Sequence, residues 1–346
     1  MSDEPCGIIR MHSVSPLLPQ RQESMEGPSP NLKPRHGELI PTPCGPIKKL
    51  SELQGPVKIY FCFTLLSMVV LFILTIFNIS KESQNEKKKG DNDDLTVSII
   101  QLVGIAFCFY YIVRGVLQEN KQELIVFGLC VFVLMVRSII NYVVPEEKET
   151  LLTVRFACII CLGVAHLICV GLLITRPNMM AFRVGGALES LQEQYCLLNL
   201  CFSMVTFDLQ AQVCLCILIL TSGPFVSTAH RIILGIGVFW AVITAAIGGI
   251  SVLKEVKPLV WIFALQNLPQ LAYFIYLLYS TITNWGESKT YILEAATITG
   301  CLLSVAIKCV LFWGLYSLYR RFGLGLREKM FSSDNQQVSP SRIGPA

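Results

Sequence analysis

The sequence has little charge. Charged residues make up 15% of its 346 residues and hydrophobic residues 53%, whereas soluble domains usually carry about 25% charged residues. The mean hydropathy is +0.57. A chain with so few charges cannot form the surface of an ordinary soluble domain, so the composition predicts an integral membrane protein.

The residue patterns of common enzyme sites are also absent. The chain has four histidines, and His12, His36 and His230 lie in a polar tail or at the end of an apolar run, so three zinc ligands cannot come together on adjacent helices. An aspartyl site needs a pair of central acids, but only Asp208 lies near the centre of an apolar run. Phosphate-binding glycine motifs and G-x-S-x-G are missing. We therefore expect no enzyme, no metal and no cofactor.

The basic residues do not form a nucleic-acid surface, because they are not interleaved with aromatic residues. They flank the apolar runs instead, where they indicate orientation. They are more numerous on the side of the N-terminus, and the last run ends in Trp313, Tyr316 and the pair Arg320 and Arg321, which is typical of a cytoplasmic interface. The loop at 81–94 carries cations that oppose this orientation. We expect the lipid bilayer as partner, no nucleic acid, and cytoplasmic termini in the plasma membrane or an endomembrane.

Eight apolar stretches predict an all-α, polytopic bundle of about eight transmembrane helices, because each approaches the ~20 residues that a spanning helix needs. The bundle is expected at 57–320. Residues 1–56 and 321–346 are rich in proline, serine, glycine or charge and are predicted to be disordered cytoplasmic tails. The spans are expected near 58–79, 95–116, 124–144, 151–174, 195–221, 231–252, 258–282 and 291–319.

Two segments do not fit a simple series of spans, and the spans show no visible internal repeat. The run at 195–221 is interrupted by Asp208 and Gln212, so it is either one span or a broken helix. Residues 178–192 mix apolar and charged side chains, which favours a helix lying on the membrane surface. No repeat between the first four and the last four spans is visible in the residue pattern, and the sequence therefore gives no sign of the duplicated halves of many transporters.

Polar side chains within the predicted spans are the candidate functional residues, because a charge or amide in hydrocarbon is costly unless it faces protein or water. They are Arg137, His166, Asp208, Gln266, Asn267, Gln270, Glu294 and Lys308. In the last span Glu294, Cys301 and Lys308 belong to a polar stripe with helical spacing, which indicates an inward face.

The depths of these residues suggest a shared polar layer. Counting about 1.5 Å per residue places Asp208, His166, Lys308 and Gln270 near the middle of the membrane. Asp208 is the acid nearest the centre of any span, so we expect it to pair with Lys308, with Arg137 as the rival partner. His166 and the amides of the seventh span would complete the layer.

Two further motifs concern helix geometry. Pro269 removes one backbone hydrogen bond and predicts a kink, with Gln266, Asn267 and Gln270 close enough to bond the freed backbone. In the sixth span Gly237, Ala241, Ala245 and Gly249 recur every four residues and predict a flat ridge for close helix packing. This ridge serves packing within the chain or, alternatively, a homodimer.

Two functions remain open from the sequence. The first is transport or sensing of a small polar solute, an ion or a lipid head group through the polar layer. The second is a non-catalytic receptor-like or accessory membrane protein, in which the same residues only fix helix packing. The sequence identifies neither a ligand nor the particular membrane.

Overall fold

The computed structural model describes residues 39–40, 42–89, 93–143, 150–176, 179–186, 188–221, 228–283, 285 and 291–331. In this part of the chain the regular structure is helical, apart from one isolated β-bridge between Ile40 and Ile47. The elements are η1 (Leu50–Glu52), α1 (Gly55–Lys89), α2 (Asp93–Leu117), α3 (Lys121–Val143), α4 (Thr150–Ile174), α5 (Met179–Gly185), α6 (Glu189–Thr221), α7 (Thr228–Leu253), α8 (Lys257–Thr283), α9 (Tyr291–Tyr319) and α10 (Leu326–Phe331).

Eight of the described helices, α1–α4 and α6–α9, are long and apolar enough to cross a membrane. Their places along the chain agree with the predicted spans. The segment containing Asp208 is one continuous helix, α6, so the broken-helix alternative is wrong. The predicted surface helix at 178–192 is shorter than expected: α5 ends at Gly185, and residues from Glu189 onward already belong to α6.

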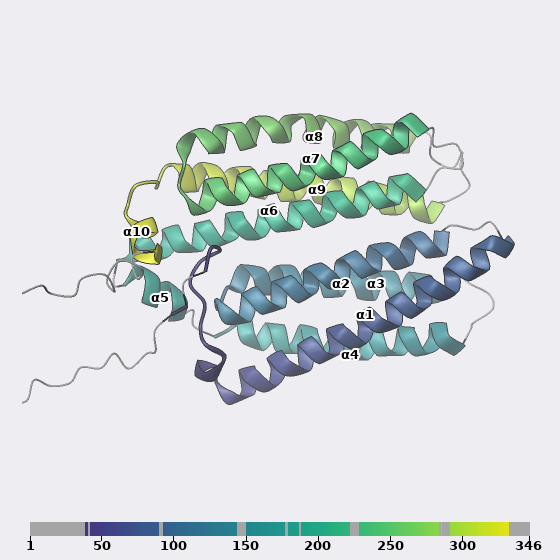
Figure 1. Cartoon of the computed structure of the whole chain (residues 1–346), viewed down its shortest axis with the longest axis horizontal. Helices are drawn as coiled ribbons and strands as arrows, with labels where there is room; N and C mark the ends of the chain where they lie inside the picture. The colour runs from purple at the N-terminus through teal and green to yellow at the C-terminus, as the bar shows by residue number, and fades with distance from the viewer. Residues whose placement is uncertain are drawn as a thin grey trace, which may run out of the picture. The chain divides into compact units, whose positions relative to one another are not determined.

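The long helices form two four-helix bundles (Figure 1). In the first bundle α1 packs against α2 and α4, and α3 also packs against α2 and α4. Consecutive helices of the bundle run antiparallel. In the second bundle α6 packs against α7 and α9, and α8 closes the ring between them. Short connections between consecutive helices enforce this up-and-down arrangement.

Helix α6 joins the two bundles, because it contacts α2 and α3 of the first bundle as well as its own neighbours. Tyr111 of α2 donates a hydrogen bond from its hydroxyl to Oε1 of Gln210, at 3.0 Å. The guanidinium of Arg114 lies 3.9 Å from the centre of the Phe202 ring. Because α6 has partners on both sides, the polar side chains on its two flanks are buried against protein.

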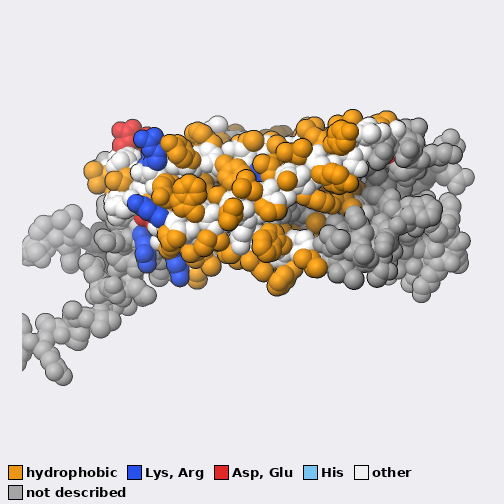
Figure 2. All heavy atoms as spheres, turned by 90° about the horizontal axis from the view of Figure 1, so that it is seen from above, with side chains coloured by type: hydrophobic (Ala, Val, Ile, Leu, Met, Phe, Trp, Pro, Cys, Tyr) orange, Lys and Arg blue, Asp and Glu red, His pale blue; other side chains and the backbone are white. Residues whose placement is uncertain are grey.

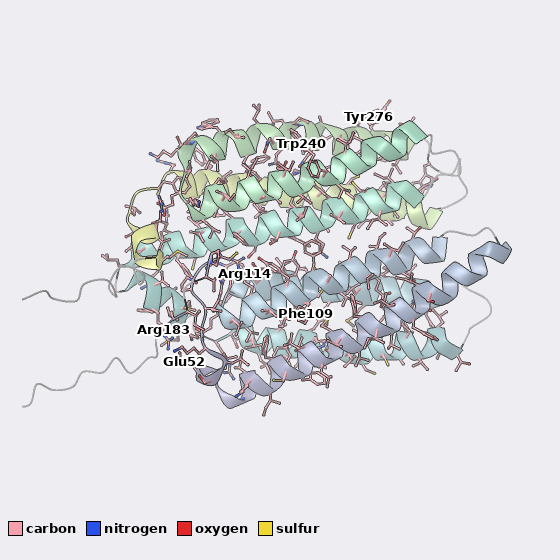
Figure 3. All side chains as sticks on the ribbon, in the orientation of Figure 1. Glu52, Phe109, Arg114, Arg183, Trp240 and Tyr276 are labelled. Carbon is pink, nitrogen blue, oxygen red and sulfur yellow. The ribbon has the colours of Figure 1, made fainter. Side chains whose placement is uncertain are left out.

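The segment before α1 packs against the helix ends, although the composition assigns it to the tail. Residues 39–40 and 42–54 of this segment are described, and the amide of Lys48 donates to the carbonyl of Leu117 at 3.0 Å. Gln118 Nε2 donates to the carbonyl of Cys44 at 3.1 Å. Arg183 of α5 pairs with Glu52 at 3.2 Å, at the end of the helices marked by both labels in Figure 3. These specific polar contacts order a segment that has little apolar surface of its own.

The surface separates charge from apolar area. In Figure 2 most of the visible Lys and Arg side chains gather at one end of the face, together with acidic side chains, and hydrophobic side chains predominate on the rest of its described part. Large apolar residues such as Ile59, Phe239, Trp261 and Tyr276 are well exposed on the outer sides of the helices. An exposed apolar surface of this extent suits contact with lipid tails rather than with water.

Candidate functional site

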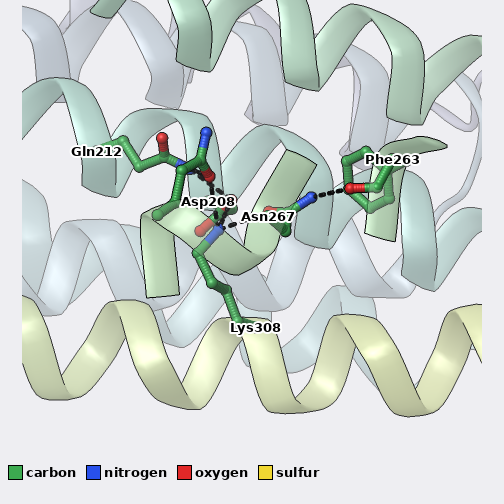
Figure 4. Close-up of polar contacts among 6 residues, drawn as sticks. Asp208, Gln212, Phe263, Asn267 and Lys308 are labelled. Atoms are coloured by element: carbon green, nitrogen blue, oxygen red, sulfur yellow. Dashed lines mark hydrogen bonds and ion pairs between the residues drawn. The ribbon is translucent and has the colours of Figure 1, made fainter. Parts of the chain in front are cut away.

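The second bundle contains a buried ion pair between α6 and α9. Nζ of Lys308 lies 2.8 Å from Oδ2 of Asp208 (Figure 4). The Lys308 side chain is 1% exposed and that of Asp208 is 6% exposed. Two charges buried this deeply need each other, because an unpaired charge in a medium of low dielectric constant is strongly destabilising.

Amide side chains complete the coordination of the ammonium. Lys308 Nζ donates to Oδ1 of Asn267 at 2.7 Å and to Oε1 of Gln270 at 3.0 Å, both on α8. Together with Asp208 these acceptors use all three N–H bonds of the ammonium. Gln212, one turn beyond Asp208 on α6, donates from Nε2 to Asp208 Oδ2 at 2.6 Å and to Gln270 Oε1 at 3.1 Å. We call these five residues the polar cluster: Asp208, Gln212, Asn267, Gln270 and Lys308.

Two polar atoms of the polar cluster have no hydrogen-bond partner in the described structure. They are Oδ1 of Asp208, an acceptor, and Nε2 of Gln270, a donor, and both are buried. A buried polar atom without a partner costs about 1–3 kcal/mol. The polar cluster therefore has one free acceptor and one free donor, which a small molecule able both to donate and to accept would satisfy.

The spacing of residues along α6, α8 and α9 places the members of the polar cluster on the buried faces of these helices. On α9 Thr297, Cys301, Ser304 and Lys308 recur at helical spacing and are all buried, so one face of the helix carries the polar stripe inward. On α8 Asn267 is fully buried, whereas Leu265 and Leu268 on either side are more than half exposed. On α6 Asp208 and Gln212 are four residues apart and share a face.

Pro269 lies inside α8, which continues as a helix from Lys257 to Thr283. The neighbouring amides do not bond the carbonyl of Leu265, which the proline leaves without its helical donor. Asn267 Nδ2 instead donates to the carbonyl of Phe263 at 2.8 Å, and its oxygen accepts from Lys308. The amides beside Pro269 thus serve the ammonium rather than the backbone freed by the proline.

The other predicted site residues are not members of the polar cluster. His166 is buried in the first bundle, where its Nε2 is 2.9 Å from Oγ of Ser67 on α1. Arg137 is half-buried on α3 of the first bundle and makes no ion pair with a described acid. Glu294 is at the start of α9 and is not among the contacts of Lys308. Gln266 is half-buried, and its Oε1 has no partner among the described residues.

The small-residue ridge on α7 is used mainly within the chain. Ala241 is buried and Ala245 packs against the apolar core of the second bundle. Phe202 of α6 lies 3.5 Å from the position where Gly249 would carry a Cβ atom. Gly237 is exposed and has open space around it, so this end of the ridge is left free for a neighbour outside the chain.

The sequence hypothesis did not include three polar contacts. Gln212 joins the polar cluster, and its spacing of four residues from Asp208 on one helix was the available signal. Ser67 is the partner of His166, and a lone serine in an apolar helix gives no such signal. Arg114 and Glu123 form a buried ion pair across the turn between α2 and α3, for which the only signal is that opposite charges flank the turn.

Two stretches of the chain, residues 44–175 and 185–317, match the family described as "Domain of unknown function (DUF7789)". The first stretch covers the first bundle, and the second covers all but the end of the second bundle. Among curated proteins and among solved structures, none matches the chain.

Proposed function

The chain belongs to the DUF7789 family, a family of unknown function, and from its polar cluster we propose that it is a multi-pass membrane protein that moves or senses a small polar solute, an ion or a lipid head group. Its eight apolar helices are long enough for a bilayer. We further propose that the termini lie in the cytoplasm, because the basic residues that flank the apolar runs are more numerous on the side of the N-terminus.

The observation that carries this proposal is the pair of unpartnered atoms beside a buried ion pair. Among the described residues Asp208 Oδ1 and Gln270 Nε2 have no partner, while every N–H bond of the Lys308 ammonium is used. A bundle held together only by polar contacts gains nothing from one unpaired acceptor and one unpaired donor. A solute with a hydrogen-bond donor and an acceptor would satisfy both atoms.

Helix α8 supplies a means for the site to open. Pro269 lies next to Gln270 and removes one backbone hydrogen bond, so α8 bends more easily there than an uninterrupted helix. Bending at this point would move Asn267 and Gln270 relative to Lys308. The ammonium would then exchange an amide oxygen for an oxygen of the solute.

The alternative function is that of a receptor-like or accessory protein in which the polar cluster only fixes helix packing. Access of water to the polar cluster separates the two functions. A membrane-impermeant, charged thiosulfonate is applied to membranes containing the full chain with Gln270→Cys, and modified cysteines are identified by peptide mass spectrometry. The matched control is Phe127→Cys, which replaces a fully buried residue of the first bundle.

Solute exchange requires an aqueous path, so we expect the cysteine at position 270 to be modified much faster than the cysteine at position 127. Equal and slow modification of both cysteines would contradict the proposal and support the packing function. The native cysteines of each peptide map serve as the internal reference for reagent access.

A further inference from the structure

The two bundles share one plan. Each has four antiparallel helices followed by a short helix, α5 after the first bundle and α10 after the second, and these short helices contact each other. Each bundle also coincides with one of the two stretches that match the same family. The corresponding helices are therefore α1 and α6, α2 and α7, α3 and α8, and α4 and α9.

The turn in the middle of each bundle is the same. Residues 116–121 read Val-Leu-Gln-Glu-Asn-Lys and residues 252–257 read Val-Leu-Lys-Glu-Val-Lys. Glu119 has φ 50° and Glu255 has φ 53°, and they are the non-glycine residues with positive φ in the described chain. Left-handed backbone is uncommon for glutamate. Finding it at the same place in matching hexapeptides means that the helices on either side of the turns correspond residue by residue.

Extending this correspondence along α3 and α8 places Phe127 opposite Phe263, and both side chains are almost fully buried. It also places Val131 opposite Asn267 and Leu134 opposite Gln270. The first bundle thus has apolar side chains where the second has the amides of the polar cluster.

The outer helices correspond in the same way. Aligning the starts of the two family stretches, at 44 and 185, sets Phe61 opposite Phe202, Ser67 opposite Asp208 and Leu71 opposite Gln212. All six of these side chains are buried. Aligning their ends, at 175 and 317, sets His166 opposite Lys308.

The aligned pairs make the same contact. Ser67 Oγ lies 2.9 Å from His166 Nε2 between α1 and α4, as Asp208 Oδ2 lies 2.8 Å from Lys308 Nζ between α6 and α9. Four of the five counterparts of the polar cluster also gather at one place, because Leu71, Val131, Leu134 and His166 line a single cavity in the first bundle. Its volume of about 20 Å³ is enough for one water molecule.

His166 lines this cavity, and its hydrogen bonds leave one ring nitrogen without a partner among the described residues. Ser67 Oγ donates its hydrogen to the carbonyl of Thr64 at 2.8 Å, so in its contact with Ser67 the imidazole donates from Nε2. Nδ1 is then an acceptor. It has no partner in the described structure, and His166 is 1% exposed. Apart from His166, the cavity lining contains no acidic or basic side chain.

We propose that the two bundles are copies of one four-helix unit and that the cavity at His166 is a second binding site, the counterpart of the polar cluster. It takes a water-sized, uncharged molecule that donates a hydrogen bond to Nδ1 of His166. A charged ligand is disfavoured, because the lining offers it no counter-charge. This proposal does not rest on solute exchange in the second bundle, because the contacts and the cavity at His166 lie in the first bundle.

The correspondence is tested by building the second pair into the first bundle. Ser67→Asp and His166→Lys each place an unpaired charge in the core, so each single variant of the full chain should unfold at a lower temperature than the wild type. The double variant should unfold at a higher temperature than either single variant. The control combines Ser67→Asp with Ile159→Lys, which puts lysine at a position on α4 that does not correspond to Lys308, and should show no recovery. A double variant no more stable than the weaker single variant would overturn the correspondence.

Occupation of the cavity is tested with water as the probe. Met68 lines the cavity and is 3% exposed, whereas Met180 is 0% exposed and does not line it. Hydroxyl radicals generated by X-rays from bound water should oxidise Met68 faster than Met180 in the full chain. Val131→Phe fills the cavity and should slow oxidation of Met68. Equal oxidation of both methionines in the wild type would show a dry cavity and overturn the second site, whether or not the filled variant folds.

Discussion

Lys308 donates from Nζ to Oδ2 of Asp208 across 2.8 Å, in a part of the second bundle where both side chains are almost completely enclosed. Around them the amides of α6 and α8 accept or donate the hydrogen bonds that water would otherwise provide. Each of the two charges therefore depends on the other for its stability in the core, and substitutions of either residue should change the unfolding temperature.

Removing one member of the pair should be worse than removing both. Lys308→Met leaves the Asp208 carboxylate without its counter-charge, and Asp208→Leu does the same to the ammonium. Loss of one partner of a buried pair costs about 3–5 kcal/mol, whereas apolar replacement of both is often neutral. We expect the Asp208→Leu/Lys308→Met variant to unfold near the wild-type temperature in detergent and both single variants well below it. Additive losses in the double variant would contradict this.

The same double variant also tests the function. Its core is closed by apolar side chains, so Gln270→Cys added to it should lose the modification by the charged thiosulfonate that we expect in the wild-type background. Unchanged modification would show that water reaches position 270 by a path unrelated to the pair.

Asn267 and Gln266 are adjacent amides with different expected effects. Asn267 is fully buried, accepts from Lys308 and donates to the Phe263 carbonyl, so Asn267→Leu should lower the free energy of unfolding by about 1–3 kcal/mol. Gln266 Oε1 has no partner in the described part of the chain, and Gln266→Leu should have little effect. Thermal unfolding of the two purified variants measures the difference. Equal losses of unfolding free energy in the two variants would mean that the hydrogen bonds of Asn267 do not stabilise the fold.

Two glycines of α7 are expected to respond differently to alanine. A Cβ at Gly248 would lie 2.5 Å from the Phe263 ring, which is buried and cannot move aside easily, so Gly248→Ala should cost about 1–3 kcal/mol. Gly237 has nothing within 4 Å of its Cβ position, and Gly237→Ala should be neutral or stabilise the helix by about 0.5–1 kcal/mol. Unfolding temperatures in detergent give the comparison.

Gly237 also tests the predicted homodimer. If a second copy packs on the exposed end of the ridge, Gly237→Leu should reduce cross-linked dimer in membranes while leaving the unfolding temperature unchanged. Unchanged dimer would place any contact between copies elsewhere.

The two matching turns predict a backbone effect. Glu119 and Glu255 have left-handed backbone, which asparagine tolerates and β-branched residues do not. Replacement of either glutamate by Val or by Asn removes the carboxylate, and at Glu119 also its contact with Lys48. The difference in stability between the Val and the Asn variant therefore reports the cost of the left-handed backbone. We expect Val to be less stable than Asn by about 1–2 kcal/mol at each position. A difference at only one turn would weaken the correspondence of the two bundles.

Much of the architecture followed from the sequence. The apolar runs predicted the eight long helices, because a helix satisfies its own backbone and needs only an apolar surface of sufficient length. The stripe of Cys301, Ser304 and Lys308 indicated which face of α9 turns inward. The pairing of Asp208 with Lys308 followed by elimination, because other central charges were scarce.

The repeat could not be recognised from the residue pattern, and the reason is physical. Burial constrains a membrane helix mainly to be apolar, so corresponding positions such as Leu71 and Gln212 have diverged while their places in the fold remain the same. Only the turn at Glu119 and Glu255, where the backbone restricts the residue, kept a recognisable motif.

The sequence by itself determined how many helices of membrane length there are and how deep each polar residue lies along its helix, since both depend only on the apolar character and rise of a single helix. Tertiary structure decided which residues of equal depth meet. His166 is bonded to Ser67 in one bundle while Lys308 binds Asp208 in the other, because depth fixes a residue along the helix axis, and only packing between helices fixes its neighbours across that axis.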